Sequence, residues 1–130
     1  MTIVAHILKS KPIRTVHTIT PTASVFDAIT LMAEKNVGGL VVTEGDRAVG
    51  IITERDYARK IVLRDRTSKE TSVRDIMTSP VMCVRPDQTS QECMQLMTEK
   101  RLRHLPVVDR GELIGLISIG HLVKDIISEQ

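Results

Sequence analysis

A corner between a strand and a helix at Gly50–Asp56 carries the residue types best suited to ligand chemistry. Thr53 precedes Asp56 by three residues. This spacing is typical of a capping box, in which two side chains satisfy backbone amides of the first helical turn. A carboxylate at such a corner could also accept the two hydroxyls of a ribose, and the helix-start amides would favour a nearby phosphate. The residues leave both interpretations open.

A second candidate is the basic run Lys100–His104. Cations at the end of a helix complement its dipole, which is the simpler interpretation. The similar stretch Lys35–Leu40 keeps the lysine, but it has Gly38 and Gly39 where the later run has Arg103 and a histidine. If the cations only ended a helix, both stretches should need them. An anion site approached closely by the glycines is the alternative.

The chain lacks the spacing patterns of catalytic and metal sites. It has no GxSxG, P-loop or GxGxxG motif. Its histidines are scattered, and none has ligand spacing with a cysteine or a carboxylate. We therefore expect neither an enzyme nor a metal protein. The four histidines are His6, His17, His104 and His121.

The composition favours a globular cytoplasmic protein. A hydrophobic share of 42% in 130 residues supports a packed core, and the 2% aromatic content argues against modules that stack nucleic-acid bases. A net charge of +2 is too small to indicate a polyanionic partner. No apolar run is long enough to span a membrane, and the first residues lack the basic region of a signal peptide. Cys83 and Cys93 lack CxxC spacing, which favours reduced thiols.

The chain is a duplicated unit. A shift of 65 residues aligns Pro21–Val62 with Pro86–Ile127 without a gap. Such a density of matches in one order indicates an internal repeat. The identical pairs are Pro21/Pro86, Leu31/Leu96, Met32/Met97, Glu34/Glu99, Lys35/Lys100, Leu40/Leu105, Val42/Val107, Gly50/Gly115, Ile52/Ile117 and Ile61/Ile126.

Each copy predicts the order strand, helix, strand, strand, helix, after a short lead-in helix. In the first copy Ser24 and Asp27 have the spacing of a helix cap, and apolar residues then recur with helical period. Polar turns separate the two later strands. In the first copy the predicted elements are Val4–Leu8, Val16–Ile19, a helix from Ser24, Leu40–Val42, Ala48–Ile52 and Glu54–Leu63. In the second they are Val73–Met77, Val81–Val84, the repeated helix, Leu105–Val108, Leu113–Ile117 and Ile119–Ser128.

These elements predict an α+β fold of two β-α-β-β-α repeats. The first repeat with its lead-in segment is expected at residues 1–63, a polar linker at 64–72, and the second repeat at 73–130. One repeat of this size buries little apolar surface, so the two should pack together through their sheets. A pseudo-twofold axis would then relate two equivalent clefts.

The residues resemble the CBS (cystathionine β-synthase) domain family, in particular its small stand-alone tandem pairs, or Bateman modules. The resemblance covers about Val4 to Ile127. It implies a pseudo-symmetric pair, usually dimeric, that binds adenosine ligands such as AMP, ATP, NAD or S-adenosylmethionine. The segments that carry it are Pro21–Ala28, Arg103–Asp109, Gly50–Asp56 and Gly115–Ser118.

The resemblance also assigns residues to the ligand. Thr53 and Asp56 match the family positions that hold the ribose, and the basic residues before the Leu-Pro-Val strand match those that meet phosphate. The adenine would lie near the first strand, beside the glycines of the same cleft. The implied nucleotide-binding residues are Thr15, Val16, His17, Gly38, Gly39, Thr53, Asp56, Arg103 and His104.

The second copy departs from this pattern, because His121 stands where the family has aspartate. A neutral imidazole offers one acceptor where a carboxylate offers several. The resemblance therefore implies a second, weaker cleft that would include Arg55, Ser118 and His121.

The sequence is compatible with three functions. The first is a sensor that binds an adenosine nucleotide and shifts the packing of the repeats or of two chains. The second is an interaction module that regulates a partner enzyme or transporter without an obligate ligand. The third, an RNA-binding adaptor, depends on the basic run alone and lacks stacking aromatics. The apolar helices Tyr57–Leu63 and Leu122–Ile127 further predict a homodimer.

Overall fold

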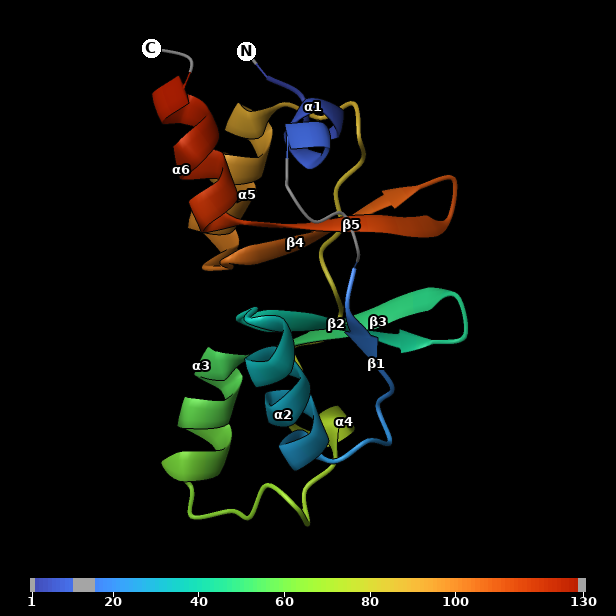
Figure 1. Ribbon diagram of the computed structural model, residues 1–130, viewed down its shortest axis with the longest axis vertical. Helices are drawn as coiled ribbons and strands as arrows, with labels where there is room; N and C mark the ends of the chain where they lie inside the picture. Colours follow the sequence, from blue (N-terminus) through green and yellow to red (C-terminus); the bar gives the residue numbers. More distant parts are fainter. Residues whose placement is uncertain (1, 11–15, 129–130) are drawn as a thin grey trace. The chain divides into compact units, whose positions relative to one another are not determined.

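The computed structural model describes residues 2–10 and 16–128, which form two compact units (Figure 1). One unit is the continuous segment His17–Val81. The other combines Met1–Val16 with Met82–Gln130. The expected α+β fold is confirmed, since each unit contains a small sheet and several helices.

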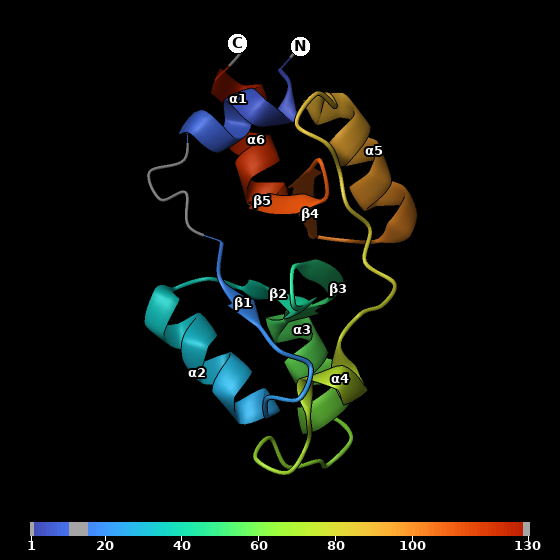
Figure 2. The same ribbon diagram turned by 90° about the vertical axis from the view of Figure 1, so that its right-hand side faces the viewer.

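The unit at 17–81 is a three-stranded sheet with helices on one face (Figures 1 and 2). The strand order is β1-β2-β3, with β1 parallel and β3 antiparallel to β2. The side chain of Ser24 accepts the Asp27 amide at the start of the first long helix, as predicted. The elements are β1 (Thr18–Ile19), α2 (Val25–Lys35), β2 (Gly39–Glu44), β3 (Arg47–Thr53), α3 (Glu54–Tyr57), a π-helix (Ala58–Val62) and α4 (Val73–Ile76).

The other unit repeats this plan with a smaller sheet. Its β4-β5 hairpin is antiparallel, and a single parallel bridge joins Val84 to Val107. Its helices lie on one face of the hairpin in both views (Figures 1 and 2). The elements are α1 (Val4–Ser10), α5 (Ser90–Lys100), β4 (His104–Asp109), β5 (Glu112–Ser118) and α6 (Ile119–Ser128).

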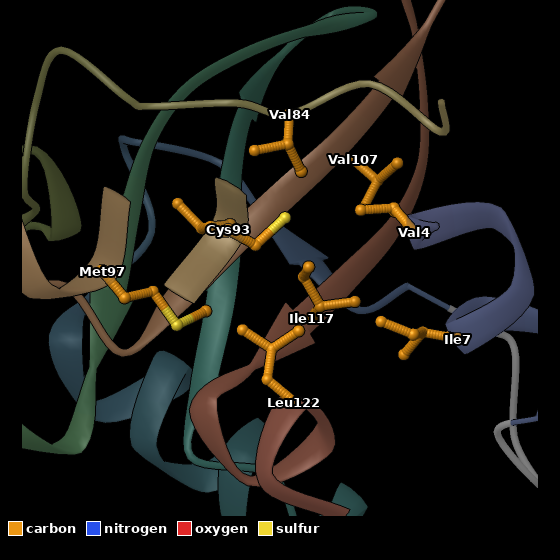
Figure 3. Close-up of a cluster of buried hydrophobic side chains, with 9 residues drawn as sticks. Val4, Ile7, Val84, Cys93, Met97, Val107, Ile117 and Leu122 are labelled. Carbon is orange, nitrogen blue, oxygen red and sulfur yellow. The ribbon is translucent and has the colours of Figure 1, made fainter. Parts of the chain in front are cut away.

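The compact units differ from the expected repeats 1–63 and 73–130, because the lead-in helices are exchanged. In α1, Val4 and Ile7 are buried in the core that Leu122 and other residues of the second repeat form (Figure 3). In α4, Val73 and Ile76 belong to the core of the first repeat. Each lead-in helix thus buries its apolar side chains in the repeat that it does not directly precede in the sequence: α1 in the second repeat and α4 in the first.

Matching backbone hydrogen bonds hold the two exchanged helices. Val4 N–H donates to Gln88 O at 2.8 Å, and Val73 N–H donates to Ala23 O at the same distance. A second pair, Ala5 N–H to Pro86 O and Arg74 N–H to Pro21 O, measures 2.9 Å in both units. Since each acceptor precedes the long helix of its repeat, the lead-in helix is part of the unit and not of a linker.

Several expected elements differ from the structure. The strand expected at Val16–Ile19 is shortened to β1, Thr18–Ile19. The strand expected at Val81–Val84 is reduced to the Val84 bridge, since residues 81–83 have no strand partner. The helix expected at Glu54–Leu63 is α-helical only to Tyr57 and then widens into the π-helix. The expected linker 64–72 lies within the 17–81 unit, where Val25 N–H donates to Thr71 O at 2.9 Å.

Candidate functional site

The Gly50–Asp56 corner forms a complete capping box, which confirms the structural interpretation of its sequence. Thr53 has extended backbone angles (φ −128°, ψ 166°), so β3 ends there and α3 begins. Its Oγ1 accepts the Asp56 N–H at 3.2 Å. In return, Oδ2 of Asp56 accepts the Thr53 N–H at 3.0 Å and the Thr53 hydroxyl at 3.1 Å. The cap fixes the carboxylate at the edge of the sheet.

The second oxygen of the Asp56 carboxylate faces two further donors. Lys60 Nζ lies 3.2 Å from Oδ1, and the Thr78 hydroxyl donates to it at 3.4 Å. Asp56 is buried, with 8% of its surface exposed. A buried carboxylate needs such partners, because an unpaired charge away from water is costly. Charge and hydroxyl donors therefore converge on this one group.

Several residues expected to bind nucleotide lie around the same edge. Gly39 pairs with Thr53 across β2 and β3, and Gly38 O accepts the Glu54 N–H at 3.1 Å. On the neighbouring strand, His17 O accepts the Val41 N–H at 3.3 Å. The structure thus brings Gly38, Gly39, Thr53 and Asp56 together, with His17 one strand away. Val16 directly precedes His17, and Thr15 lies outside the described residues.

The second repeat builds the same corner from different side chains. His104 pairs with Ser118 across β4 and β5, and Arg103 O accepts the Ile119 N–H at 2.9 Å. Arg103 is exposed and His104 is half-buried. These residues belong to a different compact unit from Asp56, while Arg55 belongs to a different unit from Ser118. Within its own unit, each copy therefore has one corner of the same backbone geometry.

His121 replaces the carboxylate of the cap with an imidazole nitrogen. Its Nδ1 accepts the Ser118 N–H at 2.9 Å and lies 3.1 Å from the Ser118 hydroxyl. The His121 N–H donates to Ser118 Oγ at 3.3 Å, which completes a reciprocal cap. A nitrogen that accepts an amide hydrogen carries no proton, so this geometry selects the tautomer with hydrogen on Nε2. The one acceptor nitrogen of the ring is thus already hydrogen-bonded to the Ser118 amide.

Lys60 and Thr78 were not singled out by the sequence. Lys60 follows Asp56 by four residues, and oppositely charged residues at that spacing are neighbours on a helix, so its position could have been inferred. Thr78 is 22 residues from Asp56. Only the packing of the chain after α4 against β3 brings it near, and no local pattern signals that contact.

The two cysteines are free thiols without the features of a reactive site. Burial raises the pKa of the Cys93 thiol to about 11 and also raises the pKa of Cys83. Both thiols are therefore protonated near neutral pH, and thiolate is the form that attacks or binds metal. Among residues 2–10 and 16–128, no three His, Cys, Asp or Glu side chains are grouped to hold a metal ion. Over the same residues, no helix has the length and hydropathy to cross a membrane.

Comparisons with known proteins identify the two repeats. The family model described as the CBS domain matches residues 4–63 and 73–128. A solved signal-transduction protein with CBS domains from Burkholderia ambifaria is 60% identical, with a TM-score of 0.94 over 99% of this chain and 96% of that one. A CBS-domain protein from Agrobacterium tumefaciens is 35% identical, with a TM-score of 0.89 over 96% of this chain and 99% of that one.

Curated relatives extend the comparison beyond bacteria. A mitochondrial CBS domain-containing protein of Arabidopsis thaliana is 45% identical over 82% of this chain. The chain spans about half the length of that relative, namely 54%. A CBS domain pair solved in complex with 5′-methylthioadenosine and S-adenosyl-L-methionine has a TM-score of 0.85 at 23% identity, over 100% of this chain and 99% of that one. At this identity, the similarity shows a shared fold.

Proposed function

This chain belongs to the CBS-domain family as a tandem pair, and from that premise we propose that it is a regulatory module that binds an adenosine-containing nucleotide. AMP, ATP, NAD and S-adenosylmethionine share the adenosine part and form the ligand class. The domain pair solved with 5′-methylthioadenosine and S-adenosylmethionine supports this class. The module is proposed to act by changing the packing of its repeats and not by catalysis.

One observation carries the proposal, namely the buried Asp56 carboxylate beside Thr53 at the edge of the sheet. A carboxylate accepts hydrogen bonds from the vicinal hydroxyls of a ribose, and such charge-assisted bonds are stronger than neutral ones. Gly39 begins β2 beside this corner and Gly38 directly precedes it, so both supply backbone without a side chain. His17 and the preceding Val16 and Thr15 are proposed to lie near the adenine, as the family resemblance implies.

The phosphate of the nucleotide is proposed to bind Arg103 and His104. An arginine guanidinium offers two parallel donors to phosphate oxygens. In the first repeat the equivalent residues are Gly38 and Gly39, which carry no charge.

A second, weaker site is proposed around Ser118, His121 and Arg55. Since His121 Nδ1 already accepts the Ser118 amide, a ribose hydroxyl finds no charged acceptor there. We expect the site at Asp56 to fill first.

A thermal-shift panel of adenosine ligands tests the function. A ligand that binds only the native state at 100 times its Kd stabilises by about 2.7 kcal/mol, so the melting temperature should rise by several degrees. Ribose 5-phosphate and GMP serve as controls for the sugar phosphate and for another base. If no adenosine ligand in the panel raises the melting temperature above these controls, the proposed function is wrong.

Removal of the Arg103 charge should affect AMP and adenosine differently. We expect Arg103→Ala to weaken AMP binding by about five- to ten-fold, which is less than a buried charged hydrogen bond would give, because the arginine is exposed and its charge is screened by solvent. Adenosine has no anion for the guanidinium to meet, so its affinity should not change. Lys100→Ala, which removes an exposed cation from the same run, is the matched control. Calorimetric titration measures the affinity for both ligands. If AMP and adenosine lose affinity equally, Arg103 does not bind the phosphate.

Exposed apolar residues favour the alternative of an interaction module, and they predict a homodimer. Val62 at the end of the π-helix is 57% exposed, the following Leu63 is 77% exposed, and Ile127 of α6 is 64% exposed. Exposed apolar side chains that form a contiguous patch commonly mark an interface. We expect light scattering to give a dimer at micromolar concentration, and Leu63→Ser with Ile127→Ser to give a monomer. A monomeric parent, with and without AMP, would rule out this dimer.

A further inference from the structure

The Asp56 carboxylate is shared between the helix cap and the segment by which the chain leaves its unit. We call Ile76–Val81 the exit segment, because the 17–81 unit ends at Val81 and the other unit resumes at Met82. Lys60 bridges Asp56 and this segment, since its Nζ donates to Ile76 O at 2.8 Å and lies 3.2 Å from Asp56 Oδ1. Thr78 contacts the same Oδ1 directly.

The exit segment is also held against β3. Thr78 N–H donates to Ile51 O at 2.8 Å, and Ile51 N–H donates to Thr78 O at 3.1 Å. The Ser79 hydroxyl donates to Val49 O at 3.0 Å. Gly50 permits this close approach, because a Cβ there would lie 2.7 Å from Met77 Sδ and 3.0 Å from Thr78 O. The strand that leads to the candidate site is therefore in direct contact with the exit segment.

The acceptor capacity of Asp56 limits what else it can bind. A carboxylate offers about four lone-pair directions. Within the described residues, the Thr53 amide and hydroxyl occupy Oδ2, while Lys60 and Thr78 occupy Oδ1. The Oδ2 contacts belong to the backbone cap. The Oδ1 contacts are weaker, since the Thr78 bond is 3.4 Å long and the Lys60 side chain is 37% exposed. A further donor would displace those first.

We propose that a ribose and the exit segment compete for Asp56 Oδ1. Lys60 and Thr78 are then positioning residues, which hold the carboxylate in the absence of ligand. Ribose hydroxyls displace them and loosen the exit segment. The contacts of Lys60 and Thr78 thereby link the site to one of the two places where the chain passes from one unit to the other. This inference rests on the proposed function for the identity of the competing ligand.

Amide hydrogen exchange of Ile51 and Thr78 tests the hold on the exit segment without ligand. Lys60→Met keeps the aliphatic stem but removes the charge and both contacts. It should raise exchange at these two amides by about three- to ten-fold, the factor for one partly exposed charged hydrogen bond. Arg59→Met removes an exposed cation from the same π-helix and should leave exchange unchanged. Equal amide exchange at Ile51 and Thr78 in the two variants would show that Lys60 does not hold the exit segment.

The competition itself is tested with AMP and 2′,3′-dideoxy-AMP at equal occupancy, as measured by calorimetry. AMP should raise exchange at Ile51 and Thr78 in the parent, whereas the analogue without ribose hydroxyls should not. In Lys60→Met, AMP should add little, and its affinity should rise because one competitor is gone. If AMP binds without raising exchange, the inference is wrong and the proposed function stands. If AMP does not bind, the proposed function and the competition fail together.

Discussion

Replacement of Ile7 by alanine should destabilise the protein by about 2–5 kcal/mol, the range for a large aliphatic side chain removed from a packed core. Ile7 is 2% exposed and belongs to one buried cluster with Leu105, Ile117 and Leu122. The loss should therefore fall on residues 82–128, although Ile7 precedes the first repeat in sequence. Denaturant unfolding measures the size of the loss, and hydrogen exchange shows where the chain opens.

Ile76→Ala is the matched control for this prediction. Ile76 is 1% exposed and stands at the corresponding position of the other lead-in helix, in the core of the 17–81 unit. Its loss should be of similar size but should fall on residues 17–81. If Ile7→Ala instead loosened residues 17–63, the exchange of lead-in helices would be contradicted.

Asp56→Ala should weaken AMP binding by about 1.5–3 kcal/mol, or roughly 10- to 150-fold, because it removes the charged acceptor for the ribose. Loss of the cap should also lower the free energy of unfolding by about 1 kcal/mol. Lys60 loses its partner in the same variant, which adds to the cost. Calorimetric titration gives the change in affinity, and denaturant unfolding gives the change in stability.

Glu92→Ala separates capping from ligand binding. Thr89 and Glu92 form a capping box at the start of α5, with the same reciprocal bonds as Thr53 and Asp56. Backbone and side-chain hydrogen bonds lower the pKa of Glu92, in keeping with its role as an acceptor. Its removal should lower stability but leave AMP affinity unchanged. An Asp56→Ala variant that is less stable yet binds AMP as tightly as the parent would leave Asp56 with the capping role alone.

Much of the fold follows from patterns that are local in sequence. The repeat, the helix cap at Ser24 and the paired strands were predictable because they depend on residues a few positions apart. The π-helix was not, since the same residues Ala58–Val62 fit an α-helical pattern. The exchange of lead-in helices depends on which of two similar cores each helix completes, and both helices present the same apolar spacing. The sequence cannot distinguish those two pairings.

The candidate site likewise has a part that local spacing predicts and a part that depends on tertiary packing. Thr53 and Asp56 were found from their spacing, and the capping box that they form is confirmed. The neighbours of Asp56 depend on tertiary packing, so Thr78 had no signal in the sequence. The role of Arg103 and His104 toward a phosphate stays a prediction, as does the contact of Val16 and His17 with an adenine.

The exchanged lead-in helices have a consequence for the order in which a nascent chain can fold. The unit at 17–81 is continuous, so it can form as soon as its last residues leave the ribosome. The other unit is discontinuous, and α1 is synthesised before all of the residues between Val84 and Leu122 with which it forms a core. Domains generally fold as units during synthesis. Val4 and Ile7 must therefore wait for residues 84–122 before they can be buried, while the intervening 17–81 unit can already fold.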